Sequence, residues 1–407
     1  MDLLIKQARL NDGEDLQDVA VEKGRITQIA PVIEGDAKEV IEAAGRVLIP
    51  GLVESHIHLD KALIADREPN KSGTLKEAIE VTAKLKPTFT EEDVYQRAKQ
   101  ALEMIIRRGA TTVRTHSEFD PAQGFTGFNM IMKLKEEYKD RIDMQVVAFP
   151  QEGIFKAPGT EKMMYEAMDM GADVVGGIPY NDAPANDHID LIFEIAKKYD
   201  KDIDLHQDFA DEADDTSIEY LCKKTIQEGY EGRVSVGHLT ALHAMPKERL
   251  DRVISQMAKA KINVMPLPAT DLHLGARGDE CNVRRAVTPI RKLRDAGVNV
   301  CLATNNIRNA FTPYGNGDLM QIAMLAIPVG HLGGADDLPT VLPMITENPA
   351  KALNLQDYGL AVGKKADMVL LDTKVKANAI IDIPERAYVI KNGRITVKVD
   401  TTVTLSQ

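Results

Sequence analysis

Short apolar runs alternate with amphipathic stretches through the middle of the chain, from residue 47 to about residue 355. The apolar runs predict eight strands, because each is short and bounded by turn or loop residues. We expect these strands to end near His58, Glu118, Gln151, Pro179, His206, His238, Pro268 and Thr304.

Residues 90–109 show the helical pattern most clearly among the segments between the strands. Thr90 and Asp93 resemble a capping box, and Gly109 suits the position just after a helix ends. Four apolar residues share one helical face: Val94, Ala98, Leu102 and Ile105. We expect this helix, and those in the other intervening segments, to pack that face on the strands.

Eight strands that are each followed by a helix predict parallel βα units. Such units close into a (β/α)8 TIM barrel or form an open doubly wound sheet. The open sheet requires a glycine-rich phosphate loop after its first strand, and residues 49–60 carry no GxGxxG pattern. The sequence therefore favours an α/β fold in which the eight units close into a (β/α)8 TIM barrel.

Both ends of the chain predict strands joined by tight turns. Lys23-Gly24 lies between two alternating runs near the N-terminus, and Asn392-Gly393, a strong hairpin signal, does the same near the C-terminus. The simplest arrangement assembles the two ends into one small β-sandwich domain. We expect that domain to contain residues 1–50 and 358–407, and the barrel domain to contain residues 51–357.

Composition and charge exclude several classes of protein. Hydrophobic residues make up 44% and charged residues 28%, which is ordinary for a globular protein. Lys and Arg number 50 against 62 Asp and Glu, a net charge of −12, which argues against a nucleic-acid partner. No apolar run reaches the roughly 20 residues of a membrane span. The N-terminus lacks a signal peptide, and three scattered cysteines without a CxxC pair favour the reducing cytoplasm.

Four of the nine histidines stand at predicted strand ends: His56, His58, His206 and His238. In a barrel of this kind the functional groups lie at the carboxyl ends of the strands. His56 and His58 alternate on one strand, so both imidazoles point to the same side. Imidazole is a ligand for zinc or ferrous iron, and the pair predicts half of a metal site. Histidines held by backbone hydrogen bonds are the alternative.

Several stretches of the chain resemble the amidohydrolase superfamily, and within it the cytosine deaminase and N-isopropylammelide amidohydrolase branch. Residues 49–61 are similar to the first-strand motif, and residues 346–372 are similar to the segment that returns to the terminal sheet. The motif QVVAFPQEG at residues 145–153 is typical of that branch. Further matching stretches are residues 72–80, 113–116, 171–179, 202–208 and 237–245.

The resemblance implies a distorted (β/α)8 barrel of the metal-dependent hydrolase type, with a single divalent metal ion, zinc or iron. Carried over residue by residue, it implies His56, His58 and His206 as ligands, with His238 assisting the hydrolytic water. Gln151 matches the glutamine that binds the substrate amide edge, and Lys61 and Asn306 are further candidates for substrate contact. A second metal ion would need a bridging Lys or Glu on the fourth strand, which has neither. The resemblance also implies a homo-oligomer.

Two positions depart from the family pattern. The strand-eight aspartate, which ligates the metal and accepts a proton, is replaced by Asn305, which can offer an oxygen ligand but cannot act as a base. Family deaminases place a proton-shuttling glutamate three residues after the strand-five histidine, where this chain has Phe209. We expect Asn305 to keep a place in the metal site and Phe209 to line the substrate site.

Other carboxylates could replace the lost pair. Asp271 is the best placed and is our candidate for catalysis; Asp208, Asp60 and Glu118 also lie near strand ends, and for each the alternative is a structural role. We expect an enzyme that cleaves a C–N bond of a small nitrogen heterocycle, such as a pyrimidine or triazine, with loss of ammonia or an amine. The alternatives are a cyclic amide or carbamate hydrolase, and a ligand-binding homologue without turnover.

Overall fold

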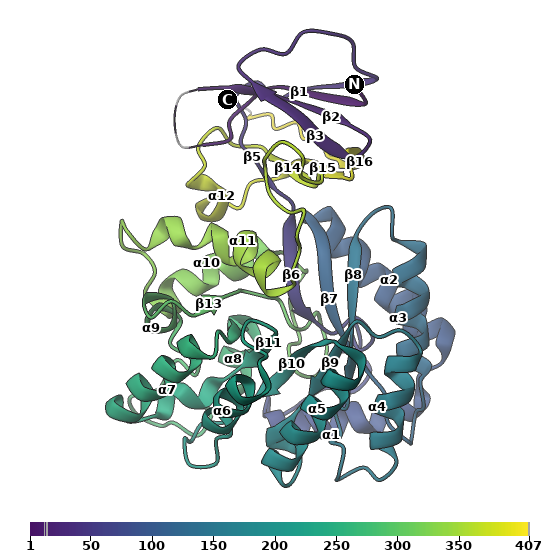
Figure 1. The fold of residues 1–407 in the computed structure, drawn as a ribbon, viewed down its shortest axis with the longest axis vertical. Coiled ribbons are helices and arrows are strands. Elements are labelled where there is room, and N and C mark those ends of the chain that lie inside the picture. The colour runs from purple at the N-terminus through teal and green to yellow at the C-terminus, as the bar shows by residue number, and fades with distance from the viewer. Residues whose placement is uncertain (12, 14, 406–407) are drawn as a thin grey trace.

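The computed structural model describes residues 1–11, 13 and 15–405, and its largest unit is an eight-stranded parallel sheet curled into a barrel (Figure 1). The strands follow one another around the sheet in chain order. They are β6 (Leu52–Ile57), β7 (Ala110–Glu118), β8 (Asp143–Phe149), β9 (Val174–Gly177), β10 (Asp202–Gln207), β11 (Val234–His238), β12 (Asn263–Met265) and β13 (Asn299–Val300). The prediction of eight barrel strands is confirmed.

The eighth strand differs from the expectation, because only two residues pair regularly with β12. After Cys301, which donates to the Val264 carbonyl (2.8 Å), the chain turns and Leu302 donates to the Met344 carbonyl (2.7 Å). The chain rejoins the barrel at Asn305. The backbone N of Asn305 donates to the His56 carbonyl, and the Asn305 carbonyl accepts from the backbone N of His58, both at 2.9 Å. These two bonds close the barrel at its functional end.

Helices surround the barrel in Figure 1 and bury their apolar faces against it. The α-helices are α1 (Leu75–Leu85), α2 (Glu91–Arg107), α3 (Thr126–Glu137), α4 (Thr160–Asp169), α5 (Ala185–Tyr199), α6 (Ile218–Glu228), α7 (Lys247–Lys259), α8 (Pro268–Leu274), α9 (Ile290–Asp295), α10 (Leu319–Gly330), α11 (Glu347–Ala352) and α12 (Asn378–Ile381). Short 3-10 helices are η1 (Lys86–Thr88), η2 (Pro179–Asn181), η3 (Thr240–Ala244), η4 (Leu338–Thr340) and η5 (Leu342–Ile345). None of the helices in the described ranges combines the length and apolar character needed to cross a bilayer.

Helix α2 confirms most of the pattern seen in residues 90–109. Thr90 is its N-cap, with the hydroxyl accepting from the backbone N of Asp93 (3.3 Å), and Gly109 follows the helix with a φ of 99°. The Asp93 side chain does not complete a capping box, because its carboxylate binds Arg67 and Arg97 instead. A charge-assisted bond to arginine is stronger than a bond to one backbone amide, which explains the difference.

The two chain ends build two four-stranded sheets that pack as a sandwich, as predicted. One has the order β3-β2-β1-β4 and the other the order β16-β15-β14-β5. Their strands are β1 (Leu3–Ala8), β2 (Gln17–Glu22), β3 (Arg25–Ala30), β4 (Glu39–Glu42), β5 (Leu48–Pro50), β14 (Met368–Leu371), β15 (Arg386–Lys391) and β16 (Arg394–Lys398). Leu3 and Val19 from the first sheet pack in one core with Met368 and Ile390 from the second.

Both predicted hairpins are present in this sandwich. Lys23-Gly24 joins β2 to β3, and Asn392-Gly393 joins β15 to β16. The two turns touch, since a Cβ on Gly24 would lie 3.1 Å from the Asn392 carbonyl oxygen. The domain limits at residues 50 and 358 stay a prediction.

Candidate active site

Five buried histidines meet at the carboxyl ends of the barrel strands. His56 ends β6 with His58 just beyond it, His116 lies on β7, His206 on β10 and His238 at the end of β11. Parallel strands bring their carboxyl ends to one rim, so residues far apart in sequence converge there. Gly237 permits the crowding, because a Cβ at this position would lie 2.6 Å from the His56 ring.

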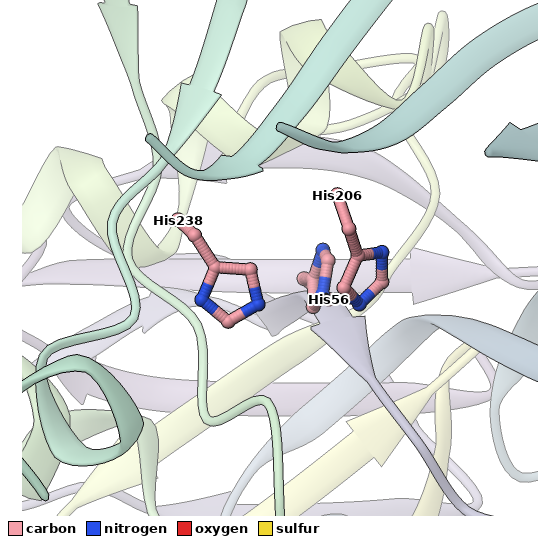
Figure 2. Close-up of side chains that lie close together, drawn as sticks. All are labelled: His56, His206 and His238. Carbon is pink, nitrogen blue, oxygen red and sulfur yellow. Dashed lines mark hydrogen bonds between the residues drawn. The ribbon is translucent and has the colours of Figure 1, made fainter. Parts of the chain in front are cut away.

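Three of the imidazoles direct their Nε2 atoms at one point. The His206 Nε2 lies 3.2 Å from that of His56 and 2.9 Å from that of His58. Figure 2 shows His56 and His206 close together, with the ring of His238 facing them across a gap. The ring centroids of His206 and His238 are 5.3 Å apart.

The three imidazoles are held in the neutral form. Burial, together with neighbouring cationic groups, lowers the pKa of His56, His58 and His206 well below the ordinary value. Neutral imidazole carries the free lone pair that a metal ion requires. Three lone pairs at such short range repel one another unless a cation or a shared proton lies between them.

Asn305 stands beside this cluster and contributes a further oxygen. Its backbone is left-handed, with a φ of 61°, which Asn tolerates better than most residues. The amide group is buried and lines the same cavity as His58, His206 and His238. Among the described residues, its Oδ1 atom has no hydrogen-bond partner.

This set of donors fits a metal ion of the zinc or ferrous iron type. Ligand nitrogens about 2.1 Å from a tetrahedral ion lie roughly 3.4 Å apart, close to the separations of the His206 Nε2 atom from its two neighbours. The buried, unpartnered Asn305 oxygen is a fourth donor of suitable chemistry. His56, His206 and His238 also offer ligand atoms within 4.8 Å of one another, as do His56, His58 and His116.

A carboxylate stands behind the cluster on β10. Asp204 accepts from Arg114 (2.9 Å) and contacts His116 Nε2 (3.2 Å), and it lies 3.8 Å from the Nδ1 of His56. Burial opposes its ionisation, but His116 and Arg114 hold the pKa of Asp204 below its ordinary value. The site therefore has a buried negative charge close to a candidate ligand, although Asn305 itself is neutral.

Asp271 and His238 form the clearest acid–base pair of the site. Asp271 lies on α8, after the seventh strand as predicted, and its Oδ1 lies 2.7 Å from the His238 Nδ1. Its Oδ2 accepts from the backbone N of Leu267 (3.1 Å), and burial raises its pKa. The carboxylate fixes the His238 ring with Nδ1 protonated, which leaves Nε2 free to accept a proton.

The other candidate carboxylates have different roles. Asp208 accepts from the backbone N atoms of Ser217 and Ile218 at the start of α6, so it is a structural residue. Asp60 accepts from the backbone N of Glu118 (2.7 Å). Glu118 binds two buried lysines, Lys61 and Lys86; burial opposes its ionisation, but the two ammonium groups lower its pKa to about 2.

A small cavity opens beside the histidines. Its volume is ≈ 20 Å³, and it is lined on one side by His58, His206, His238 and Asn305. Its remaining walls are Lys61, Leu75, Gln151, Tyr180, Thr270, Leu274, Asn306 and Phe311. Polar groups and apolar side chains therefore share the surface that a ligand would contact.

The predicted substrate-binding residues Lys61, Gln151 and Asn306 all lie on this cavity. The Lys61 ammonium donates to the Gln151 Oε1 (2.9 Å) and stands 4.5 Å from the centre of the Phe311 ring. Asn306 donates to the Thr270 hydroxyl at 3.4 Å and accepts from Asn309 at 2.6 Å. These contacts bring together residues from three separate loops and from helix α8.

Phe209, the fourth predicted substrate residue, packs edge-on against His238, with ring centroids 4.9 Å apart. It belongs to an apolar cluster with Leu274, Phe311 and residues Ala78 and Val81 of α1. A hydrogen-bonding group at this position would face apolar carbon. Phe209 therefore presents an apolar surface to His238, at the position where the resemblance implies a proton-shuttling glutamate.

Sequence reasoning missed Asp204 and the apolar cover of the cavity. Asp204 precedes His206 by two residues on one strand, so its side chain points to the same face, and this spacing could have revealed it. Leu75, Tyr180, Leu274 and Phe311 carry no such signal, because apolar residues in loops and helix ends are common. Only the tertiary structure places them over the site.

Comparison with known proteins identifies the family of this chain and finds the same fold. The family model described as the amidohydrolase family matches residues 39–397. The N-isopropylammelide isopropyl amidohydrolase of Pseudomonas sp. (strain ADP) is 36% identical over 406 residues, which cover 98% of this chain and 97% of that protein.

Two solved structures are also similar along their full length. The 5-methylcytosine deaminase from Klebsiella pneumoniae, liganded with 5-fluorocytosine, has a TM-score of 0.94 and 32% identity, with 99% of both chains covered. The N-isopropylammelide isopropylaminohydrolase from Burkholderia multivorans has a TM-score of 0.86 and 27% identity, covering 98% of this chain and 99% of that one.

Proposed function

This chain belongs to the amidohydrolase family, and from that premise we propose that it uses one metal ion to cleave a carbon–nitrogen bond of a small nitrogen heterocycle. The observation that carries the proposal is the convergence of three neutral imidazoles and one unpartnered amide oxygen beside the cavity. The relatives named above act on isopropylammelide and 5-methylcytosine, both ring compounds with nitrogen substituents.

The metal ligands in this proposal are the Nε2 atoms of His56, His58 and His206 and the Oδ1 atom of Asn305. Zinc or ferrous iron suits this set. When bound, the ion supplies Lewis acidity that makes water a nucleophile near neutral pH. With three neutral imidazoles and a neutral amide, the anionic groups nearest the site are Asp204, Glu118 and Asp271.

His238, held by Asp271, accepts the proton in this chain. Asn305 cannot accept a proton, and the His238 Nε2 faces the ligand cluster while Asp271 holds its Nδ1. Water then adds to the ring carbon that bears the leaving nitrogen, giving up a proton to His238. The imidazolium, stabilised by the buried Asp271 carboxylate, returns a proton to the leaving amine, and the ring keeps the oxygen.

Lys61, Gln151 and Asn306 orient the heterocycle. The Gln151 amide matches donors and acceptors on a ring edge, and the Lys61 ammonium stabilises negative charge that develops on a ring oxygen or nitrogen. Phe209 and the cluster around it exclude water from the leaving-group side of His238. The polar and apolar walls together favour a flat, partly polar substrate.

A second candidate function is ligand binding without turnover, which the two departures at Asn305 and Phe209 favour. Restoring the family pattern with Asn305→Asp and Phe209→Glu distinguishes the two. Turnover by the unaltered protein ends the binding hypothesis, whereas activity that appears only in the restored variant supports it. Hydrolysis of a cyclic amide, the remaining alternative, releases no ammonia or amine, so product analysis separates it.

The deciding experiment measures bound metal and hydrolysis together. Purified protein is loaded with zinc or with ferrous iron and offered pyrimidines, alkylamino-triazines and cyclic amides, with product identified by mass. We expect one equivalent of metal and release of ammonia or an amine from at least one amino-substituted ring. Protein that holds one equivalent of metal and hydrolyses none of these compounds contradicts the proposal.

We also propose that the protein works in the cytoplasm as a homo-oligomer. The cysteines support a reducing compartment, since Cys222, Cys281 and Cys301 are all unpaired. Sedimentation of the purified protein measures the oligomeric state directly, and a single species at the mass of one chain contradicts this part.

A further inference from the structure

Helix α1 covers the cavity beside the histidines. Its first residue, Leu75, lines the cavity, and Ala78 and Val81 pack against Phe209 and Phe311. The cavity of ≈ 20 Å³ is far smaller than the roughly 300–1,000 Å³ of a typical small-molecule pocket. A heterocycle therefore enters only when the residues that cover the cavity move.

The end of this cover is anchored by a buried lysine. Lys86 is the first residue of η1 and directly follows α1, and only 4% of it is exposed. Its ammonium lies 2.8 Å from the Glu118 Oε2, 2.7 Å from the Glu152 Oε1 and 3.4 Å from the Asp120 Oδ2. Movement of α1 away from the barrel would draw Lys86 out of this set of carboxylates.

The other oxygen of the same Glu118 carboxylate binds Lys61, the cation of the cavity wall. Lys61 in turn donates to Gln151 at 2.9 Å, so its ammonium has a defined position between Glu118 and the amide. Glu118 is itself fixed, because its backbone N donates to the Asp60 carboxylate at 2.7 Å. The buried Glu118 carboxylate therefore binds both Lys86, which directly follows α1, and Lys61, which lines the cavity.

We propose that Glu118 and Lys86 are positioning residues that couple the closing of α1 to the placement of the Lys61 ammonium beside Gln151. With α1 closed, each Glu118 oxygen holds one ammonium group and the Lys61 geometry is defined. With α1 open, Glu118 loses Lys86 and Lys61 loses its fixed direction. Buried ion pairs contribute little net stability, and a defined geometry is what such a network supplies here.

Hydrogen exchange of the zinc-loaded protein tests the coupling without any substrate. The variant Lys86→Met removes the anchor, Lys86→Arg restores the charge, and Lys84→Met is the matched control, because Lys84 lies on α1 but pairs with exposed Glu68. We expect Lys86→Met to speed exchange in both residues 75–85 and residues 59–64, and Lys86→Arg to restore both. Faster exchange in residues 75–85 alone, or the same change in Lys84→Met, overturns the proposal.

If Lys86→Met fails to fold, Glu152→Gln weakens the same anchor through its partly exposed partner, and the same two segments are read.

Kinetics give a second readout, which rests on the proposed function because it treats Lys61 as a substrate contact. We expect Lys86→Met to lower kcat/KM by roughly 10- to 100-fold, since misplacement of a binding group by about 1 Å has effects of that size. In a Lys61→Met background, Lys86→Met should have little further effect. Fully additive losses overturn the coupling. If the wild-type protein turns over no substrate, the proposed function fails, and the hydrogen-exchange result still decides the coupling.

Discussion

Replacing Asp271 by Asn tests the assignment of the proton acceptor. The change keeps the shape of the side chain, removes its charge and replaces one of its two acceptor oxygens with an NH2 group. With the amide oxygen toward the His238 Nδ1 (2.7 Å), the His238 ring keeps its position and tautomer, and the NH2 group loses the bond that Oδ2 accepted from the backbone N of Leu267. What the His238 ring loses is the anion that stabilises the imidazolium formed when His238 accepts the proton from water.

The size of the effect follows from the burial of the pair. Asp271 is fully buried and His238 is 5% exposed, so solvent screens their interaction poorly. A positioned acid–base group contributes about 10²–10⁴-fold to the rate, so we expect kcat to fall about 10³-fold, or roughly 4 kcal/mol of transition-state stabilisation. The KM should change little, since Asp271 does not line the cavity.

The assay is steady-state hydrolysis by zinc-loaded protein, with bound metal measured in every sample. Asp279→Asn is the control, because Asp279 follows α8 in the chain and pairs with Arg284 away from His238; its kcat should stay within about twofold of the wild-type value. Adding Asn305→Asp to Asp271→Asn should recover part of the lost rate by supplying a second base. An Asp271→Asn protein with full metal content and wild-type kcat refutes this reasoning.

Three further predictions follow from the same structure. Phe209→Glu should lower kcat/KM for an alkylamino-substituted ring about 10-fold or more relative to the unsubstituted amino ring, because it places a carboxylate in the apolar cluster; paired rate measurements on two such rings check this, and an unchanged ratio contradicts it. Asp182→Ala should destabilise the fold by about 3 kcal/mol in urea unfolding, because its carboxylate accepts from the backbone N of Ile154 (2.6 Å) and lies 2.8 Å from the His188 Nδ1. Burial opposes ionisation, but these bonds lower the pKa of Asp182 below that of the unfolded chain, so its contribution is present above about pH 4 and is lost as the pH falls further; equal acid sensitivity in Asp182→Ala and wild type would argue against it. Removal of metal with a chelator should abolish hydrolysis, and one equivalent of zinc should restore it, with the unfolding temperature raised when zinc is present.

The arrangement of charge suggests how this site manages without the family aspartate. The Nδ1 of His56 lies 3.8 Å from Asp204, that of His58 lies 3.8 Å from Glu118, and that of His238 lies 2.7 Å from Asp271. Among the described residues, the Nδ1 atoms of His56 and His58 have no hydrogen-bond partner, so Asp204 and Glu118 act on those rings through charge alone, whereas Asp271 also fixes the orientation of the His238 ring. Under the proposed function, the negative charge near the metal ion comes from these three carboxylates, which lie behind the histidine rings, because Asn305 is neutral.

Periodicity and local motifs were sufficient to predict the barrel, the sandwich and the hairpins at Lys23-Gly24 and Asn392-Gly393. These features depend on spacing along the chain, which the sequence displays directly. The four histidines at strand ends were predictable for the same reason, since parallel strands carry their carboxyl ends to one rim. The resemblance to a known family then identified Gln151 and the departures at Asn305 and Phe209.

Which side chains the site residues contact was decided only by the tertiary structure. Nothing in the local sequence separates Asp271, which contacts His238, from Asp208, which caps α6, because both are acids just after a strand. Likewise, the placement of α1 over the cavity and the sharing of Glu118 between Lys61 and Lys86 join segments that are distant along the chain. Such contacts follow from the packing of loops and helix ends on the rim, where a side chain's role is set by its neighbours in space and no repeating pattern records them.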